Sequence, residues 1–432
     1  MNCRNRAAWA AAPSARPAAE RLRSVLLATC CVLIGSASAQ PTEGLSFERA
    51  QALATERAPM IMARRASVDA ARYLELVADQ LPDPRLTLGI DNLPISAADR
   101  FSLSREPMTQ RSLGWLQEVP NRDKRAARAL AAQARSEREI ATLEVDRLGI
   151  RREVAQAWAA RYFAERQLGL FQGLLDENRL LRSTVGARIA GGRATPADST
   201  MARQDLLLLA DRRDELARAQ TQAQATLRRW LGDEAQWPLA GALPALSAEV
   251  QDLHRGIARH ADLLLFEPVA RMAQAEVQEL EAGRKGDWNW QLAYSKRGSA
   301  YGDMVSFQIG FDLPLWQASR QDPQIAAKRK EAERIGAERE ELMRRRREEI
   351  DLQLADLDEL TRKLDRLQTV ATPLANERVA LALAAYEAAR GDLAGVLVAR
   401  RERAELGLRA VELEARQFAV RARLNFFIAE SR

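Results

Sequence analysis

Apolar residues follow two different spacings along the chain, and the switch between the spacings occurs twice. Every second residue is apolar in 84–93 and again in 287–295, which is the spacing of half-buried β-strands. After a loop, each stretch is followed by a second alternating stretch that ends at a proline, Pro120 in one case and Pro314 in the other. The pattern predicts two β-hairpins, with strands at about 84–93, 110–119, 287–295 and 304–313.

Helical spacing dominates the stretches that follow the hairpins. Residues 122–189 contain no proline, and the stretch from Pro323 to about Arg390 contains only Pro373 after its first residue. Narrow seams of apolar residues, spaced three, four or seven apart, predict long coiled-coil helices. At a rise of about 1.5 Å per residue, each helix would be roughly 100 Å long, which is too long to pack inside one globular domain.

Each long helix is followed by a turn and a returning helix, at 196–231 in the first half and 393–430 in the second. The order of helix, two strands and long helical hairpin therefore occurs twice. We interpret 40–236 and 248–432 as two structural repeats, joined by a linker rich in proline and glycine at 237–247.

The N-terminal residues resemble a cleavable signal peptide. Five arginines precede an apolar run at 25–35, and Ala37-Ser38-Ala39 has the small-x-small pattern of a cleavage site. Eleven apolar residues are too few to span a bilayer, so we expect residues 1–39 to be removed after export. Lipidation and the true start codon stay open at this stage. All the cysteines lie in this segment, so no disulfide or thiolate metal site is expected in the remainder.

The charge and the motifs argue against several functional classes. The formal net charge of +6 falls to about +2 without residues 1–39, which removes the main support for nucleic-acid binding. No nucleophile motif or phosphate-binding loop is present, so we expect neither an enzyme nor a cofactor site. Beyond residue 39 the histidines are His254 and His260, which are six apart and do not share a helix face. They are interpreted as structural helix residues, and no metal site is expected.

The hairpins predict a membrane role. Closing a barrel takes about eight strands or more, so a sheet of four has to close with copies of itself, and three copies give twelve strands. Strands of nine or ten residues match a tilted bilayer crossing. Aromatic residues in the strands would supply the membrane band: Trp115, Trp288, Trp290, Tyr294, Phe307 and Phe311. The predicted fold is mostly α with transmembrane β, a membrane pore extended by a tube of helices.

Several local patterns, in this order, resemble the TolC-type outer-membrane efflux factors. They include "LSFERAQALATERAP", "LPDPRLTL", "QEVPNRDKRAAR", "GGRATPADSTMAR" and "AAYEAARGDLAGVLVARR", and the resemblance covers nearly the whole chain beyond the signal peptide. The strand entry "LPDPRL" and the strand exit "VPNRDKR" look most like the CzcC-type branch, which serves heavy-metal efflux pumps.

The resemblance implies a homotrimer with a twelve-stranded barrel in outer-membrane lipid and an α-helical tunnel through the periplasm. It also implies docking to a periplasmic adaptor (membrane-fusion) protein and to an inner-membrane pump of the resistance-nodulation-division (RND) type. The chain would be a passive export duct, with heavy-metal cations as the expected cargo. Drug efflux and type I protein secretion by the same duct stay open, as does a periplasmic coiled-coil adaptor or scaffold, although such a protein has no use for transmembrane hairpins.

The resemblance also places a gate at the turns between the long helices. Asp198 matches a frequent family aspartate, so three copies of it would form an acidic constriction, but an acidic residue just after Pro196 also suits a helix start. The family's acidic ring positions are here Gly395 and Val398, which weakens the case for an acidic gate.

Other residues near the turns are candidates for closing the gate. Arg188 and Arg193 would tie adjacent hairpins together, and Tyr386 matches the aromatic residue that precedes the family's second turn. Gly192 and Gly391 are expected to reverse the chain.

Overall fold

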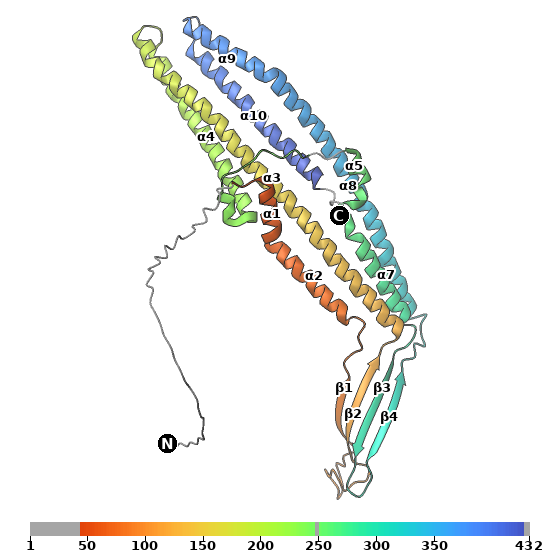
Figure 1. The fold of residues 1–432 in the computed structure, drawn as a ribbon. Helices are drawn as coiled ribbons and strands as arrows, with labels where there is room; N and C mark the ends of the chain where they lie inside the picture. The colour runs from red at the N-terminus through yellow and green to blue at the C-terminus, as the bar shows by residue number, and fades with distance from the viewer. Residues whose placement is uncertain (1–43, 247–249, 427–432) are drawn as a thin grey trace, which may run out of the picture. The chain divides into compact units, whose positions relative to one another are not determined.

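The structure, a computed structural model, describes residues 44–246 and 250–426 (Figure 1). Residues Gly44–Arg432 form one compact unit, and the fold below concerns that unit alone. The expected signal peptide at 1–39 lies outside the described residues, as do the last residue of the expected linker and residues 427–432.

The first half of the unit consists of four α-helices and two strands. In order they are α1 (Phe47–Arg57), α2 (Pro59–Val77), β1 (Arg85–Asp91), β2 (Gln110–Val119), α3 (Arg122–Ala190) and α4 (Pro196–Leu231), followed by the 3₁₀ turn η1 (Gly232–Gln236). Side chains cap the starts of α1 and α3: Ser46 accepts a hydrogen bond from the Arg49 N–H at α1, and Asn121 accepts one from the Lys124 N–H at α3.

The second half begins with short helical pieces before a comparable series. They are α5 (Val250–Arg255), η2 (Ile257–Arg259), α6 (Ala261–Leu264), α7 (Phe266–Ala282), β3 (Trp288–Lys296), β4 (Met304–Phe311), α8 (Gln321–Arg366), η3 (Leu367–Ala371), α9 (Thr372–Glu387) and α10 (Leu393–Asn425).

The second long helix, expected from Pro323 to about Arg390, is helical from Gln321 to Glu387 and contains one π-helical turn, η3, between α8 and α9. Pro373 follows this turn, and proline has no N–H to donate to the carbonyl one helical turn earlier. The chain widens there, and the Thr372 hydroxyl donates a hydrogen bond to the Leu367 carbonyl over 2.9 Å. The first long helix has no proline and runs unbroken through α3.

Each strand continues into one helix at the same end of the sheet, and we call such a strand–helix unit a lane. Four lanes lie side by side. α2 leads to β1, β2 leads to α3, α7 leads to β3 and β4 leads to α8. The sheet is antiparallel with the order β1-β2-β3-β4. The helices contact one another in the same order, α2 with α3, α3 with α7 and α7 with α8 (Figure 1). The helices therefore lie side by side in the same order as the strands to which they connect.

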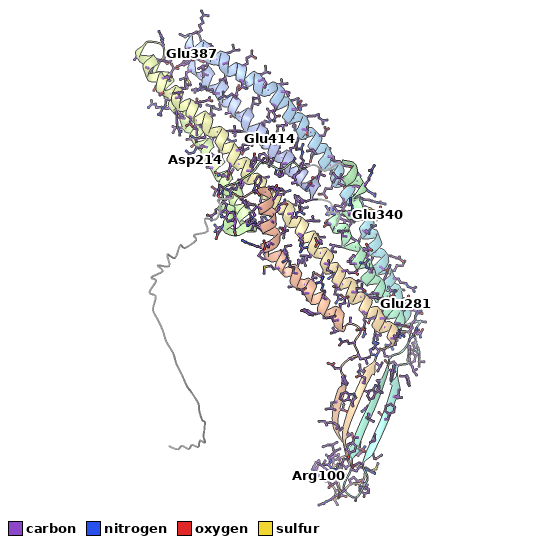
Figure 2. All side chains as sticks on the ribbon, in the orientation of Figure 1. Arg100, Asp214, Glu281, Glu340, Glu387 and Glu414 are labelled. Carbon is purple, nitrogen blue, oxygen red and sulfur yellow. The ribbon has the colours of Figure 1, made fainter. Side chains whose placement is uncertain are left out.

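The largest apolar cluster lies where α1 meets α3, α4 and α10. The ring of Phe47 lies 5.6 Å from Trp158 and 6.2 Å from Phe418, both in edge-to-face geometry. The indole N–H of Trp158 donates to the Leu45 carbonyl over 3.0 Å, which satisfies its polar atom inside the cluster. Elsewhere the helices are covered with charged side chains, among them Asp214, Glu281, Glu340 and Glu414 (Figure 2).

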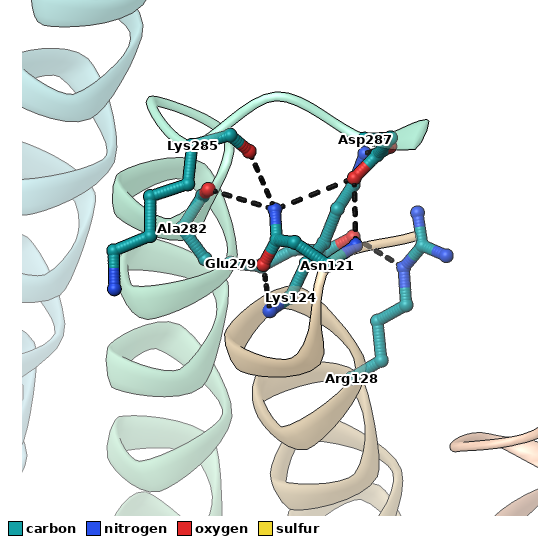
Figure 3. Close-up of polar contacts among 7 residues, drawn as sticks. All are labelled: Asn121, Lys124, Arg128, Glu279, Ala282, Lys285 and Asp287. Carbon is teal, nitrogen blue, oxygen red and sulfur yellow. Dashed lines mark hydrogen bonds and ion pairs between the residues drawn. The ribbon is translucent and has the colours of Figure 1, made fainter. Parts of the chain in front are cut away.

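A polar junction joins the second lane to the third where the helices meet the sheet (Figure 3). The Asn121 side-chain amide donates to the carbonyls of Ala282 (2.9 Å) and Lys285 (2.7 Å), and its backbone N–H donates to Asp287 (2.9 Å). Lys124 pairs with the same carboxylate over 2.8 Å. Burial alone raises the pKa of Asp287, but the hydrogen bonds from Lys124 and from the Asn121 N–H outweigh burial and hold the pKa below its ordinary value.

Candidate functional site

The strand register gives the sheet two chemically different faces. Leu86, Trp115, Leu292 and Phe307 are opposite one another across the strands, and directly opposed residues share a face. The same parity assigns these apolar residues to one face: Leu86, Leu88, Ile90, Leu113, Trp115, Val119, Trp288, Trp290, Leu292, Tyr294, Val305, Phe307, Ile309 and Phe311. Gln117 interrupts this apolar face, and the charged residues Arg111 and Lys296 lie on it at the loop end of the sheet.

The opposite face of the sheet is mostly small or polar. Its members are Arg85, Thr87, Gly89, Asp91, Gln110, Ser112, Gly114, Glu118, Asn289, Gln291, Ala293, Ser295, Ser306, Gln308 and Gly310, with Leu116 and Met304 as apolar exceptions. One face therefore suits apolar surroundings and the other suits water. The outer strands β1 and β4 each pair with one neighbour only within the described residues, so both edges of the sheet are open.

All the aromatic residues predicted to form a membrane band lie on the apolar face. Phe307 and Phe311 are 62% and 67% exposed, and neither has a covering element. Leu315 and Trp316 follow β4 and are 69% and 65% exposed, but they lie outside the alternating pattern and were not predicted to join the band. Over the described ranges, none of the helices combines the length and the apolar character that crossing a membrane requires.

The turns between the long helices lie at the end of the unit opposite the sheet. Figure 2 shows Glu387 beside one turn and Arg100 in a loop at the free end of the sheet. A small apolar cluster, the tip cluster, joins the α3–α4 hairpin to the α9–α10 hairpin. Its buried members are Leu181, Val185, Ala202, Tyr386, Leu393, Val396 and Leu397.

Arg188 and Tyr386 make the main polar contact between the two hairpins at the tip. The guanidinium of Arg188 donates to the Tyr386 carbonyl over 2.8 Å and lies 4.1 Å from the centre of the tyrosine ring. Tyr386 is 4% exposed, and among the described residues neither its hydroxyl nor the Nε of Arg188 has a hydrogen-bond partner. Both residues line a cavity of about 460 Å³ that also borders Arg193. The arrangement is a contact that a modest separation of the hairpins would break.

Ion pairs join the hairpins below the tip cluster. The guanidinium of Arg403 on α10 lies 2.7 Å from a carboxylate oxygen of Glu177 on α3. Arg401 on α10 pairs with Asp205 on α4, which is 4% exposed. Because Asp205 is buried, the loss of Arg401 would leave a charge without its counterion.

Asp198 takes part in a capping box at the start of α4. Its carboxylate accepts hydrogen bonds from the Thr195 N–H (2.7 Å) and hydroxyl (3.0 Å), and the Thr195 hydroxyl accepts from the Asp198 N–H (3.4 Å). These bonds give the residue the helix-starting role.

The turn residues differ in part from the expectation. Gly192 has a φ of 70°, and Ala389, its counterpart in the second turn, has a φ of 56°. Gly391 does not have a positive φ, but a side chain there would approach the Cβ of Ala385 within 3.1 Å. The sequence analysis also missed Asp392, whose carboxylate accepts from the Gly395 N–H over 2.9 Å and starts α10. An aspartate directly before the apolar residue Leu393 was the available signal for this helix start.

His260 does not lie inside a helix, contrary to the expectation, but precedes α6. Its Nδ1 accepts a hydrogen bond from the Asp262 N–H over 3.1 Å. Burial lowers the pKa of His260 to about 4, while Asp262 raises it, Arg346 of α8 lowers it, Glu349 of α8 raises it and Arg152 of α3 lowers it. The imidazole is therefore neutral at pH 7 and serves as a cap.

His254 lies in α5, with its Nε2 3.4 Å from an oxygen of Asp351. Within residues 44–246 and 250–426, no three histidine, cysteine, aspartate or glutamate side chains lie together as a metal site requires.

Comparisons with known proteins agree with this geometry. A sequence profile of the outer membrane efflux protein family matches residues 51–233. No curated protein sequence matches the chain.

Three solved structures are similar along most of their length. A membrane protein from Pseudomonas aeruginosa is 20% identical, with 88% of this chain and 90% of that chain covered and a TM-score of 0.74. CusC is 14% identical, with 89% and 92% covered and a TM-score of 0.73. The outer membrane protein VceC from Vibrio cholerae is 16% identical, with 89% and 96% covered and a TM-score of 0.73. The TolC-like fold expected from the sequence is thus confirmed.

Proposed function

We propose that the chain is a member of the outer membrane efflux protein family and one subunit of a passive export duct. The family profile and the shared fold support membership. The observation that carries the function is the two-faced sheet: one face is apolar and aromatic, the other small and polar, and both edges are open. Such a sheet is stable when lipid covers one face, water wets the other and copies pair at the edges.

Three copies would close a twelve-stranded barrel in the outer membrane, because four strands cannot close alone. The polar face would line the lumen, and the helices that continue the four lanes would extend it as a tunnel into the periplasm. The Trp and Tyr residues on the apolar face suit the aromatic girdle of a membrane barrel. The sequence contains no nucleophile motif, and neither the cavity at the tip nor the cap of α4 supports an enzyme.

The tip would be the periplasmic mouth of the duct. Arg188 and Tyr386 are proposed to hold the mouth closed, and a ring of three Asp198 carboxylates would face the passing cargo. At this end a periplasmic adaptor protein would dock, connecting the duct to an inner-membrane RND pump that supplies the energy. This assembly is supported by the family resemblance and the fold.

We propose heavy-metal cations as the cargo, on the strength of the CzcC-like strand entry and exit described above. The chain itself would not select the metal through soft ligands, since its cysteines all precede residue 39. A strain that lacks the gene should become more sensitive to zinc, cobalt, cadmium, copper or silver. Unchanged resistance to all five, with increased sensitivity to drugs, would assign the duct to drug efflux instead.

Purified protein in planar bilayers tests the duct itself. We expect a detergent-extracted trimer that forms conducting pores. A soluble monomer without conductance would contradict the proposal and favour a periplasmic scaffold.

A matched pair of neighbouring substitutions tests the orientation of the sheet. Phe307→Lys places a charge on the apolar face, where lipid contact costs about 2–4 kcal/mol near the bilayer centre, so membrane assembly should fail. Gln308→Lys places the same charge on the opposite face, and assembly should persist. Equal effects of the two substitutions on the yield of membrane-inserted protein would rule out the assigned faces.

A further inference from the structure

Helix α2 carries two apolar stripes on opposite sides. Ile61, Val68 and Ala71 are buried against the neighbouring helix α3. A second stripe, the outer stripe, is spaced three or four residues apart and is exposed: Pro59, Met62, Ala66, Ala70, Tyr73 and Val77. Met62 is 62% exposed and Tyr73 is 72% exposed. A helix with apolar residues on both sides is expected to pack on both sides.

An apolar groove lies between α7 and α8 on the other side of the unit. Its volume is about 570 Å³, and its apolar lining comes from Leu265, Phe266, Val269, Met272, Ile335 and Leu342. Acidic residues border it, and several already pair with basic residues, as Glu276 does with Lys328 over 3.2 Å. The proximal part of α8 is otherwise highly charged, so this groove is its main apolar recess.

Within one chain the outer stripe lies in the first lane and the groove lies between the last two lanes, so they are far apart. Between two copies that pair at their sheet edges they are neighbours. α2 belongs to the first lane, next to the open edge of β1, whereas α8 belongs to the last lane, next to the open edge of β4. If β1 of one copy continues the sheet beside β4 of another, α2 of the first copy comes beside α8 of the second.

The two surfaces also lie at similar heights above the sheet. α2 and α7 both run toward the sheet, and they end at Val77 and Ala282. At 1.5 Å per residue, Met62 is about 22 Å from the end of its helix, and Val269 is about 20 Å from the end of α7. The outer stripe therefore reaches the level of the groove.

We infer that the outer stripe of α2 in one copy packs into the α7–α8 groove of the next copy. This inference rests on the proposed trimeric duct and specifies its helical interface. The contact is head-to-tail, because each copy offers its stripe on one side and its groove on the other. Such an interface closes into a ring when the rotation between copies fits a whole number of them.

Cysteine pairs test the contact directly, because the parent chain has no cysteine beyond Cys31. The double variant Met62→Cys and Val269→Cys is extracted from membranes, oxidised and run on a denaturing, non-reducing gel. We expect covalent dimers and trimers and no larger species. Co-expression of the two single variants should give dimers only, since each copy then contributes one thiol, and the parent chain supplies the background.

Two results would overturn the inference. Dimers from Met62→Cys alone would mean that two α2 helices meet symmetrically. A double variant that shows no cross-link, although light scattering in detergent still reports a trimer, would leave the duct standing and place the interface elsewhere. A monomer in light scattering would instead contradict the proposed function itself.

A second measurement does not depend on disulfide geometry. Met62→Glu places a carboxylate on the outer stripe, whereas Met60→Glu makes the same change on a different side of the same helix, where the methionine is 53% exposed. We expect Met62→Glu to shift the detergent-extracted protein from trimer to monomer and Met60→Glu to leave the trimer intact. Identical elution of the two variants as trimers would argue against the docking of α2.

Discussion

The contact between Arg188 and Tyr386 allows a quantitative test of the proposed mouth of the duct. Arg188→Ala removes one charge-assisted hydrogen bond of 2.8 Å and a cation–π contact of 4.1 Å. A hydrogen bond to a charged group contributes about 1.5–3 kcal/mol, and a cation–π contact at a partly exposed site about 0.5–1 kcal/mol. Since Arg188 is only partly buried, we take about 2 kcal/mol per subunit as the combined contribution. That is about a thirtyfold change in the equilibrium between closed and open mouths for each contact.

Single-channel recording in planar bilayers measures the effect. We expect Arg188→Ala to raise the open fraction or the mean conductance, and Arg188→Lys to have a smaller effect, because lysine keeps the charge without the planar fork. The matched control is Arg182→Ala. Arg182 lies on α3 near the same tip, but it is exposed and its guanidinium makes no hydrogen bond or ion pair within the part of the chain that the structure describes. Equal conductance of the parent, Arg188→Ala and Arg182→Ala channels would refute the reasoning.

Three further changes probe the helical scaffold by thermal unfolding in detergent, followed by circular dichroism. His260→Asn keeps a capping side chain but cannot titrate. The pKa of His260 in the folded state, about 4, lies below the ordinary value of 6.5. The free energy of unfolding of the parent should therefore fall by up to about 3 kcal/mol as the pH falls from 6.5 to 4, and that of the variant should not. Parallel pH profiles would contradict the assignment. Ala389→Gly should raise the melting temperature, since a left-handed alanine costs about 1 kcal/mol relative to glycine, and a lower midpoint would count against the observed φ of 56°. Asn121→Ala should cost about 2–3 kcal/mol by removing a helix cap and two carbonyl contacts, and an unchanged midpoint would show that the junction contributes little.

The strands were predictable because alternation is a local property of the sequence. The predicted limits of the strand that contains Trp115 agree with β2, and the strands containing Trp290 and Phe307 differ from prediction by a residue or two at their ends. Which residues share a face across different strands is not local, since it depends on register. The structure supplies the register, and with it the separation of the aromatic residues from the polar face.

The tips were predictable only in part. Glycine and proline residues mark the first turn, so the sequence predicts a turn at Gly192. The second turn has the same backbone conformation at Ala389, which the residue type does not indicate. Contacts between distant segments, such as that of Arg188 with Tyr386, depend on how two hairpins pack, and the spacing within either hairpin does not contain them. The cap that Asp198 forms with Thr195 is a contact between residues three apart, so local spacing contains it, whereas a ring of three Asp198 residues depends on how copies assemble.

The two open edges of the sheet bear on how the protein reaches the membrane. A single copy in water would expose an apolar face of four strands and two rows of unpaired backbone groups, which is a template for aggregation. Pairing between copies would satisfy the unpaired backbone groups, and lipid would cover the apolar face, but neither does both. Assembly and insertion are therefore expected to be coupled events, and overproduction should yield aggregates in place of a reservoir of free subunits.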